Sequence, residues 1–112
     1  MNIEETKKAI EVMTDKELLE LAAKAAGIEE GIGGAFWTEF GVFDPLTDDG
    51  DALRLAVNLR LTVSWDRFND DDYATATPLY THQGYDCIVG DNPYAATRRA
   101  IVRAAAAIGE MK

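Results

Sequence analysis

Apolar residues recur at helical spacing over residues 14–27. They fall at i, i+3, i+4 and i+7, and they are Leu18, Leu21, Ala22 and Ala25. This spacing places them on one stripe of an amphipathic helix. Thr14 is a suitable N-cap, Glu17 is its capping-box partner three residues later, and Gly27 is a left-handed stop. The pattern predicts a helix between Thr14 and Gly27.

The segment before this helix has a weaker pattern. Its apolar residues at helical spacing are Ile3, Ile10 and Met13, with Ala9 and Val12 beside them. We expect one domain over residues 1–112, in which residues 1–13 form a short helix, a frayed lead or a helical extension.

Residues 29–43 are rich in glycine and aromatic residues. This stretch, EEGIGGAFWTEFGVF, contains four of each. It predicts an irregular connector whose aromatic residues enter the core, namely Phe36, Trp37, Phe40 and Phe43. Its glycines match neither a dinucleotide-binding fingerprint nor a P-loop, so we expect them to serve turns and close packing.

A second helical pattern runs to about Leu59. Asp44 and Pro45 form an extended or turn dipeptide, and either Thr47 or Asp48 can cap the helix that follows. Its main apolar stripe contains Ala52, Leu55, Ala56 and Leu59, and an adjoining stripe contains Leu53 and Val57. An apolar arc this wide predicts burial against more than one neighbour.

Three strands are predicted after this helix. In LTVSWD (61–66), Leu61, Val63 and Trp65 alternate with polar residues, which is typical of a half-buried strand. The sequence RFNDDD (67–72) predicts a polar turn, YATATPLY (73–80) a second strand, THQG (81–84) a short turn and YDCIVG (85–90) a third strand. Pro78 marks a bulge, a strand end or an exposed edge. Such short connections favour an antiparallel meander.

The last helix is predicted from Asp91 and Pro93 to a stop at Gly109. Its buried stripe contains Ile101, Ala104, Ala105 and Ile108, and Tyr94 begins the same side. About 18 residues would span about 27 Å, enough to cross three strands. Arg99 and Arg103 share the outer side, where they can pair with the acidic body or with a partner.

These elements predict an α+β fold of order α-α-β-β-β-α, in which a three-stranded antiparallel sheet is packed by two or three helices. Double-stranded RNA-binding domains have a related order, but they place lysines at the start of the last helix. This chain has Asp91, Asn92 and Pro93 there. We therefore do not expect RNA binding.

Charge also argues against nucleic acid. The net charge is −9, and residues 1–90 carry 18 acidic and 7 basic side chains. A basic protein suits such a surface better than phosphates do. Cys87 is the only cysteine, and no signal peptide or membrane span is expected, so we predict a cytoplasmic protein.

Four aspartates precede the second helical pattern, and they are Asp44, Asp48, Asp49 and Asp51. As an EF-hand loop the stretch fails, because Leu46 and Leu55 stand where oxygen ligands are needed. A magnesium site acting on phosphate compounds needs only one or two carboxylates, so spacing alone leaves it open. Capping and the helix dipole account for every aspartate without a metal, and we predict no metal or cofactor.

His82 and Cys87 are the single copies of their residue types and lie on either side of a predicted hairpin turn. A thiolate nucleophile with Asp86 as orienting group is one interpretation. We favour a turn histidine at the surface and a small core cysteine, because Cys87 alternates with Tyr85 and Val89.

The string from Asp44 to Val57, DPLTDDGDALRLAV, together with the tail RRAIVRAAAAIGEMK, resembles a family of small bacteriophage and prophage proteins described as having an α-β-α sandwich domain. Many relatives have tryptophan in place of Phe43 and glycine in place of Arg60. The resemblance covers most of the chain and implies a phage origin and this fold. It implies no catalytic residues, because the family is uncharacterised.

The sequence thus predicts a non-enzymatic phage accessory protein that binds a host or phage protein. The alternatives are a metal-dependent enzyme using the four aspartates and an acidic mimic of nucleic acid. The residues predicted to contact a partner are Trp37, Phe40, Asp70, Asp71, Asp72, Arg99 and Arg103.

Overall fold

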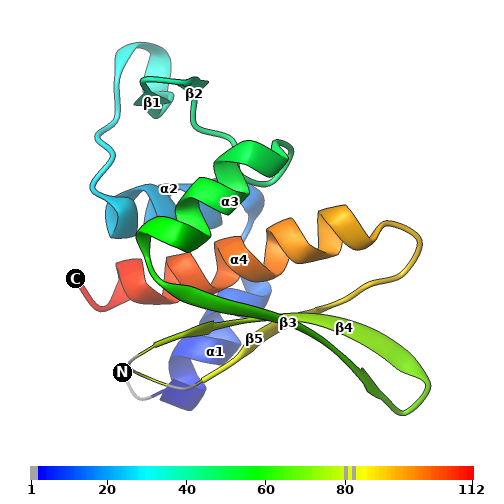
Figure 1. Cartoon of the computed structure of the whole chain (residues 1–112). Coiled ribbons are helices and arrows are strands. Elements are labelled where there is room, and N and C mark those ends of the chain that lie inside the picture. The colour runs from blue at the N-terminus through cyan, green and yellow to red at the C-terminus, as the bar shows by residue number, and fades with distance from the viewer. Residues whose placement is uncertain (1–2, 80, 82) are drawn as a thin grey trace.

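The chain forms an α+β fold in which the C-terminal helix lies between a three-stranded sheet and two other helices (Figure 1). The computed structural model describes residues 3–79, 81 and 83–112. The helices are α1 (Ile3–Val12), α2 (Asp15–Ala26), α3 (Asp49–Asn58) and α4 (Pro93–Glu110). The strands are β1 (Trp37–Thr38), β2 (Gly41–Val42), β3 (Leu61–Phe68), β4 (Asp71–Pro78) and β5 (Tyr85–Ile88), and a 3-10 turn covers Ile32–Gly34.

The start and end of α2 follow the predicted signals. The Glu17 backbone N–H donates to the Thr14 hydroxyl (3.2 Å), and the Thr14 backbone N–H donates to the Glu17 carboxylate (3.1 Å). The bond from the Thr14 backbone, and then that from its hydroxyl, lower the pKa of Glu17. Gly27 has φ +74° and ends the helix in the left-handed conformation. The capping box and the glycine stop are confirmed.

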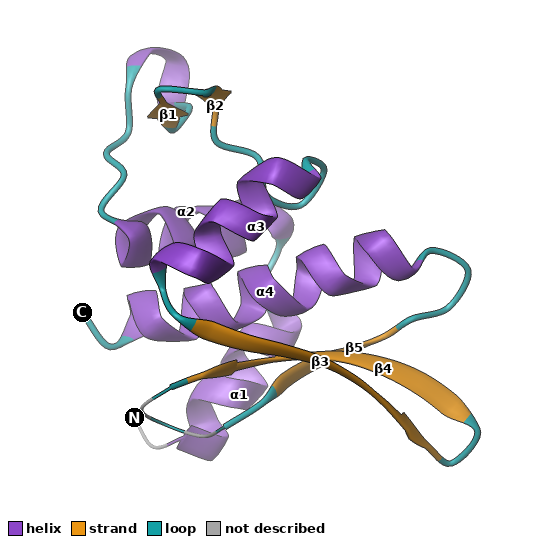
Figure 2. Cartoon of the chain, in the orientation of Figure 1, coloured by secondary structure: helices purple, strands orange, loops and turns teal. Residues whose placement is uncertain are grey.

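The predicted antiparallel meander is confirmed, with strand order β3-β4-β5 (Figure 2). The β3–β4 register runs without a bulge from Leu61 opposite Pro78 to Phe68 opposite Asp71. Only Asn69 and Asp70 form the connection, both with positive φ. The polar turn predicted over residues 67–72 is therefore too long, because a two-residue turn of this type suffices to reverse a twisted ribbon. Pro78 is a strand end.

Alanine supplies most of the buried apolar residues, so the elements around α4 approach closely. Ile10 of α1 is 1% exposed, which makes the N-terminal lead a packed helix. Gly109 does not stop α4, contrary to the prediction, since the helix continues to Glu110. A Cβ atom at Gly109 would lie 2.1 Å from the Leu21 carbonyl oxygen. Glycine is needed there because α2 and α4 nearly touch.

Several residues predicted to be buried are exposed. They are Leu53 and Val57 of α3, Trp65 of β3 and Tyr94 of α4. The prediction is wrong for Leu53 and Val57 because α3 packs mainly on α4, which covers the main apolar stripe of α3 and not the adjoining one. Helix α4 likewise covers the central strand β4 more fully than the edge strand β3. None of the described helices combines the length and apolar character needed to cross a membrane.

Arg60 follows α3 with φ +58°, a conformation that favours glycine. Its side chain donates a hydrogen bond to the Val57 carbonyl. Arg60 is therefore a left-handed helix terminator without a glycine.

Candidate functional site

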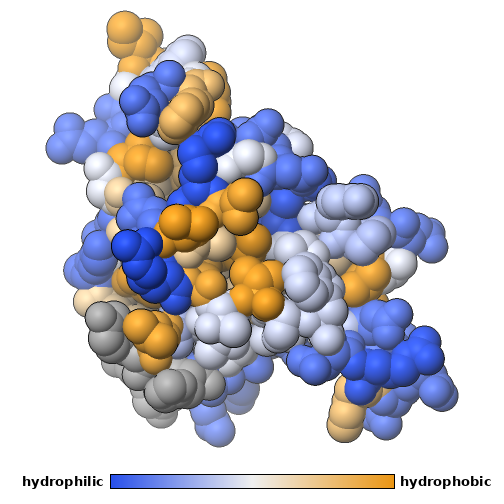
Figure 3. Space-filling model, in the orientation of Figure 1, coloured by the Kyte–Doolittle hydropathy of each residue, from blue (hydrophilic) through white to orange (hydrophobic). Residues whose placement is uncertain are grey.

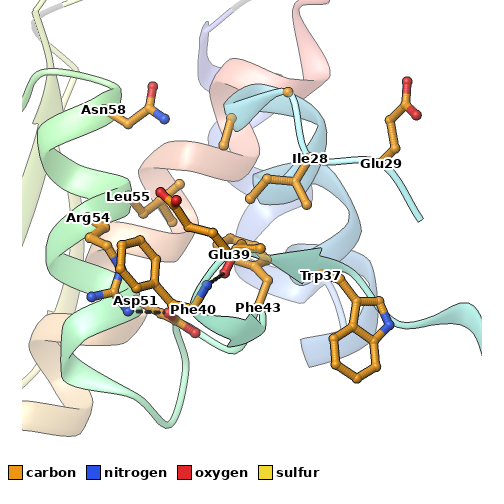
Figure 4. Close-up of a pocket in the computed structure, with 13 residues that line it drawn as sticks. Ile28, Glu29, Trp37, Glu39, Phe40, Phe43, Asp51, Arg54, Leu55 and Asn58 are labelled. Carbon is orange, nitrogen blue, oxygen red and sulfur yellow. Dashed lines mark hydrogen bonds and ion pairs between the residues drawn. The ribbon is translucent and has the colours of Figure 1, made fainter. Parts of the chain in front are cut away.

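The aspartates at the start of α3 are held in a chain of hydrogen bonds. Asp48 is the N-cap, and its carboxylate accepts a bond from the Asp51 backbone N–H (2.7 Å). The buried carboxylate of Asp51 accepts bonds from the Asp44 backbone N–H (2.8 Å) and from Arg54 (2.7 Å). Asp51 thus ties the segment before α3 to the first turn of the helix. Figure 4 shows its ion pair with Arg54.

The other two carboxylates have separate partners. Asp44 accepts a bond from the Thr47 hydroxyl (2.5 Å), and Asp49 pairs with Arg98 of α4 (2.6 Å). Among the described residues, no group of three or more His, Cys, Asp or Glu side chains is arranged to hold a metal ion. The N-cap prediction is confirmed for Asp48. The ion pair of Asp51 with Arg54 could have been found from the sequence, because the two residues are three positions apart on one helix. The ion pair of Asp49 with Arg98 could not, because these residues are distant in the chain.

Residues 36–43 form a short hairpin that projects from α2 and α3 (Figure 1), where an irregular connector was predicted. The Phe43 backbone N–H donates to the Phe36 carbonyl (2.7 Å), which closes the hairpin. Phe43 is buried, but Trp37 is 53% and Phe40 is 63% exposed, so the prediction that all four aromatic residues enter the core is wrong. Neighbouring residues of an extended chain point to opposite sides. Phe36 packs against the core, and Trp37 therefore points away from it.

A cleft of about 580 Å³ lies between this hairpin, the end of α2 and α3. Figure 4 shows the Phe40 ring beside Arg54, and the guanidinium lies 4.1 Å from the ring centroid. The same guanidinium donates a hydrogen bond to the Asp51 carboxylate (2.7 Å). A cation over an aromatic face is attractive, so Phe40 has a defined position although it is exposed. The cleft presents aromatic surface together with the carboxylates of Glu29, Glu39 and Asp51.

A second hollow, the α3/β3/α4 groove, lies on another side of α3 and has a volume of about 540 Å³. Its lining is largely apolar and includes Ala52, Leu53, Val63, Trp65, Tyr94 and Ile101. The Trp65 indole N–H donates to the Thr97 hydroxyl (3.0 Å), which orients the ring along the groove. Figure 3 shows apolar residues gathered where α3 leads into β3.

The predicted acidic turn residues lie at the free end of the β3–β4 hairpin. Asp70 is in the turn, whereas Asp71 and Asp72 belong to β4. Asp72 pairs with Arg67 (3.1 Å). Asp70 and Asp71 are exposed and have no ion-pair partner among the described residues. The tip of this hairpin therefore carries unneutralised negative charge.

The two predicted arginines of α4 both contact the body of the protein. Arg99 pairs with Asp15 of α2 (3.0 Å). Arg103 donates a hydrogen bond to the backbone carbonyl of Asp86 in β5 (2.8 Å). Of the two roles that the sequence left open, these contacts match pairing with the acidic body.

Cys87 is half-buried and packs against the core, as predicted. His82 lies outside the described residues. Its predicted place in a surface turn therefore stays a prediction, and the alternative of a nucleophile with Cys87 stays open.

Searches with family models, among curated proteins and among solved structures find no match to this chain. The phage resemblance and its implied origin stay predictions.

Proposed function

We propose that this chain is a non-enzymatic module of phage or prophage origin that binds another protein in the bacterial cytoplasm. The supporting observation is the exposure of its large aromatic residues. The chain has ten aromatic residues, and among those described five are more than half exposed. They are Trp37 (53%), Phe40 (63%), Trp65 (60%), Phe68 (67%) and Tyr94 (69%).

Aromatic side chains are the usual anchors of protein interfaces, because a rigid ring buries much area at little entropic cost. Two of the five are also oriented by the fold. Phe40 lies against Arg54, and Trp65 donates a hydrogen bond to Thr97. Rings that are held in place lose less freedom when a partner covers them.

Charge favours a basic partner. A net charge of −9 attracts positively charged proteins over a distance and speeds their association. Association driven in this way weakens as salt rises. The metal-dependent alternative has less support, because Asp48, Asp49 and Asp51 are already bonded to backbone N–H groups or arginines.

Affinity capture from bacterial lysate, at low and at high salt, tests the proposal. We expect the wild-type protein to retain a basic protein at low salt. Two double variants divide the aromatic surface, namely Trp37→Ser with Phe40→Ser and Trp65→Ser with Tyr94→Ser. At least one should lose the captured protein while keeping its fold by circular dichroism. Retention of nothing by the wild type, or of the same protein by both variants, would contradict the proposal.

A further inference from the structure

The two edges of the three-stranded sheet differ in how well they are covered. In an antiparallel pair, opposite residues alternate between positions that exchange both backbone hydrogen bonds and positions that exchange none. The two-residue turn makes Phe68 and Asp71 a bonded pair. The next pair, Arg67 and Asp72, is therefore unbonded, and Asp72 instead accepts a bond from the Val89 backbone N–H of the β5 side (2.8 Å). The pairing deduced from the turn therefore agrees with the bond observed between Val89 and Asp72.

By the same alternation, the backbone groups of Asp86 point to the free edge of β5. That edge is covered. Arg103 of α4 donates to the Asp86 carbonyl (2.8 Å), and Lys7 of α1 lies 3.9 Å from the Asp86 carboxylate. β5 is also only four residues long. Short length and a covering charge are common protections of an exposed strand edge.

The free edge of β3 has no such protection. The backbone groups of Val63, Trp65 and Arg67 point away from β4, and no backbone partner is found for them among the described residues. β3 is eight residues long and contains no proline, lysine or bulge. Such an edge is a template for one more strand.

The α3/β3/α4 groove lies beside this edge. Val63 and Trp65 line it from β3, and Leu53 lines it from α3. An added strand would lie about 4.8 Å from β3 and would direct alternate side chains toward the helices. Those side chains would enter the apolar groove. Backbone bonds and side-chain pockets would thus act on the same segment, as in known cases of strand addition.

The charge along β3 indicates which segment fits. The first half of the strand adjoins the apolar groove. Its far end leads into the acidic tip of the β3–β4 hairpin, since residues 66–72 contain four aspartates and one arginine. A suitable strand therefore carries apolar residues at one end and lysine or arginine at the other. A second copy of this chain fits poorly, because antiparallel pairing would place the acidic end of each β3 against the apolar half of the other.

We propose that the free edge of β3 accepts an extended segment of a basic partner, as a fourth strand whose apolar side chains fill the α3/β3/α4 groove. The inference rests on the proposed binding function and names its surface and its partner chemistry.

Amide hydrogen exchange measured by NMR tests this. The probe is an eight-residue peptide, the length of β3, that alternates valine with threonine and ends in lysines. At a free concentration about ten times Kd, exchange at Val63, Trp65 and Arg67 should slow about elevenfold, because only unbound protein exposes these three amides to water. The amides of Ser64 and Asp66 already bond to β4, so their exchange is slow before peptide is added and does not report on the edge.

Two variants at one position isolate the edge. Arg67→Pro removes a free-edge N–H without removing a bond to β4, and we expect peptide affinity to fall about tenfold. Arg67→Ala loses the same pair with Asp72 but keeps the N–H, so its affinity should stay within about twofold of wild type. Replacing Asp70 and Asp71 by asparagine should weaken binding and reduce its salt dependence.

Unchanged exchange at the three amides with millimolar peptide would overturn the inference, as would equal binding by folded Arg67→Pro and Arg67→Ala. Slower exchange at these amides when protein alone is concentrated would identify a second copy as the occupant and would also overturn it. If the Trp37/Phe40 variant alone loses the captured protein, the proposed function stands and this inference fails.

Discussion

Replacing Asp51 by alanine tests whether the aspartates before α3 are structural. Asp51 is buried and accepts bonds from the Asp44 backbone N–H (2.8 Å) and from Arg54 (2.7 Å). If its role is structural, its loss should destabilise the fold. In a vacant carboxylate cluster built for a cation, like charges repel, and removing one would raise stability instead. The sign of the change separates the two interpretations.

The magnitude follows from the contacts. Leaving the half-buried Asp44 N–H without an acceptor costs about 1–3 kcal/mol. The ion pair adds about 0.5–1 kcal/mol, because Arg54 is half-exposed and solvent screens its charge. The better helix propensity of alanine is offset by the loss of a negative charge from the first turn, where the helix dipole favours it. We expect a net loss of about 2 kcal/mol, which lowers Tm by about 10 °C in a domain of this size.

Urea denaturation followed by circular dichroism measures this change. Asp66→Ala is the control, because Asp66 is exposed and has no side-chain partner among the described residues, and its effect should stay within about 0.5 kcal/mol. An Asp51→Ala variant as stable as wild type, or more stable, would refute the structural role. Repeating the melts with magnesium, manganese or calcium adds a second readout, since an ion bound by the native state would raise Tm.

Three further changes have expected outcomes. Gly109→Ala should destabilise the protein by about 2 kcal/mol despite a better helix former, because its Cβ would lie 2.1 Å from the Leu21 carbonyl oxygen; stabilisation in urea titrations would contradict that contact. Arg60→Gly should stabilise by about 0.5–1 kcal/mol, because glycine adopts positive φ without strain, and a lower Tm would argue against this. Hydrogen bonds from Thr14 hold the pKa of Glu17 below its usual 4.5, so they stabilise above that pH and are lost as pH falls through the folded pKa. The stability difference between wild type and Glu17→Gln should shrink in acid, and a constant difference in urea titrations across pH would contradict the assignment.

Much of the secondary structure could be predicted because its signals are local. The capping box of Thr14 and Glu17 and the cap at Asp48 depend on residues within one turn of the chain. The three strands were recognisable from alternation and from their turns, although the turn before β4 is shorter than predicted. The segments that form α1 and the β1–β2 hairpin had the weakest periodicity. For α1 the sequence left several alternatives open, and for β1 and β2 it predicted an irregular connector instead of a hairpin.

The candidate surface could not be predicted in the same way, because exposure depends on what the rest of the fold covers. Val57 and Trp65 have the apolar periodicity of core residues, yet no neighbour covers them. Arg103 has the spacing of an outward charge, yet it reaches the backbone of β5. No property of Gly109 in the sequence shows that α2 lies against it.

Residues close in the chain thus determined where helices and strands begin and end, because capping, propensity and alternation act within a few positions. The tertiary structure alone decided which apolar stripes were buried and which edge of the sheet stayed open. Both depend on the packing of elements distant in sequence, and the small alanine side chains let α4 cover β4 and β5 closely while β3 remains at the margin.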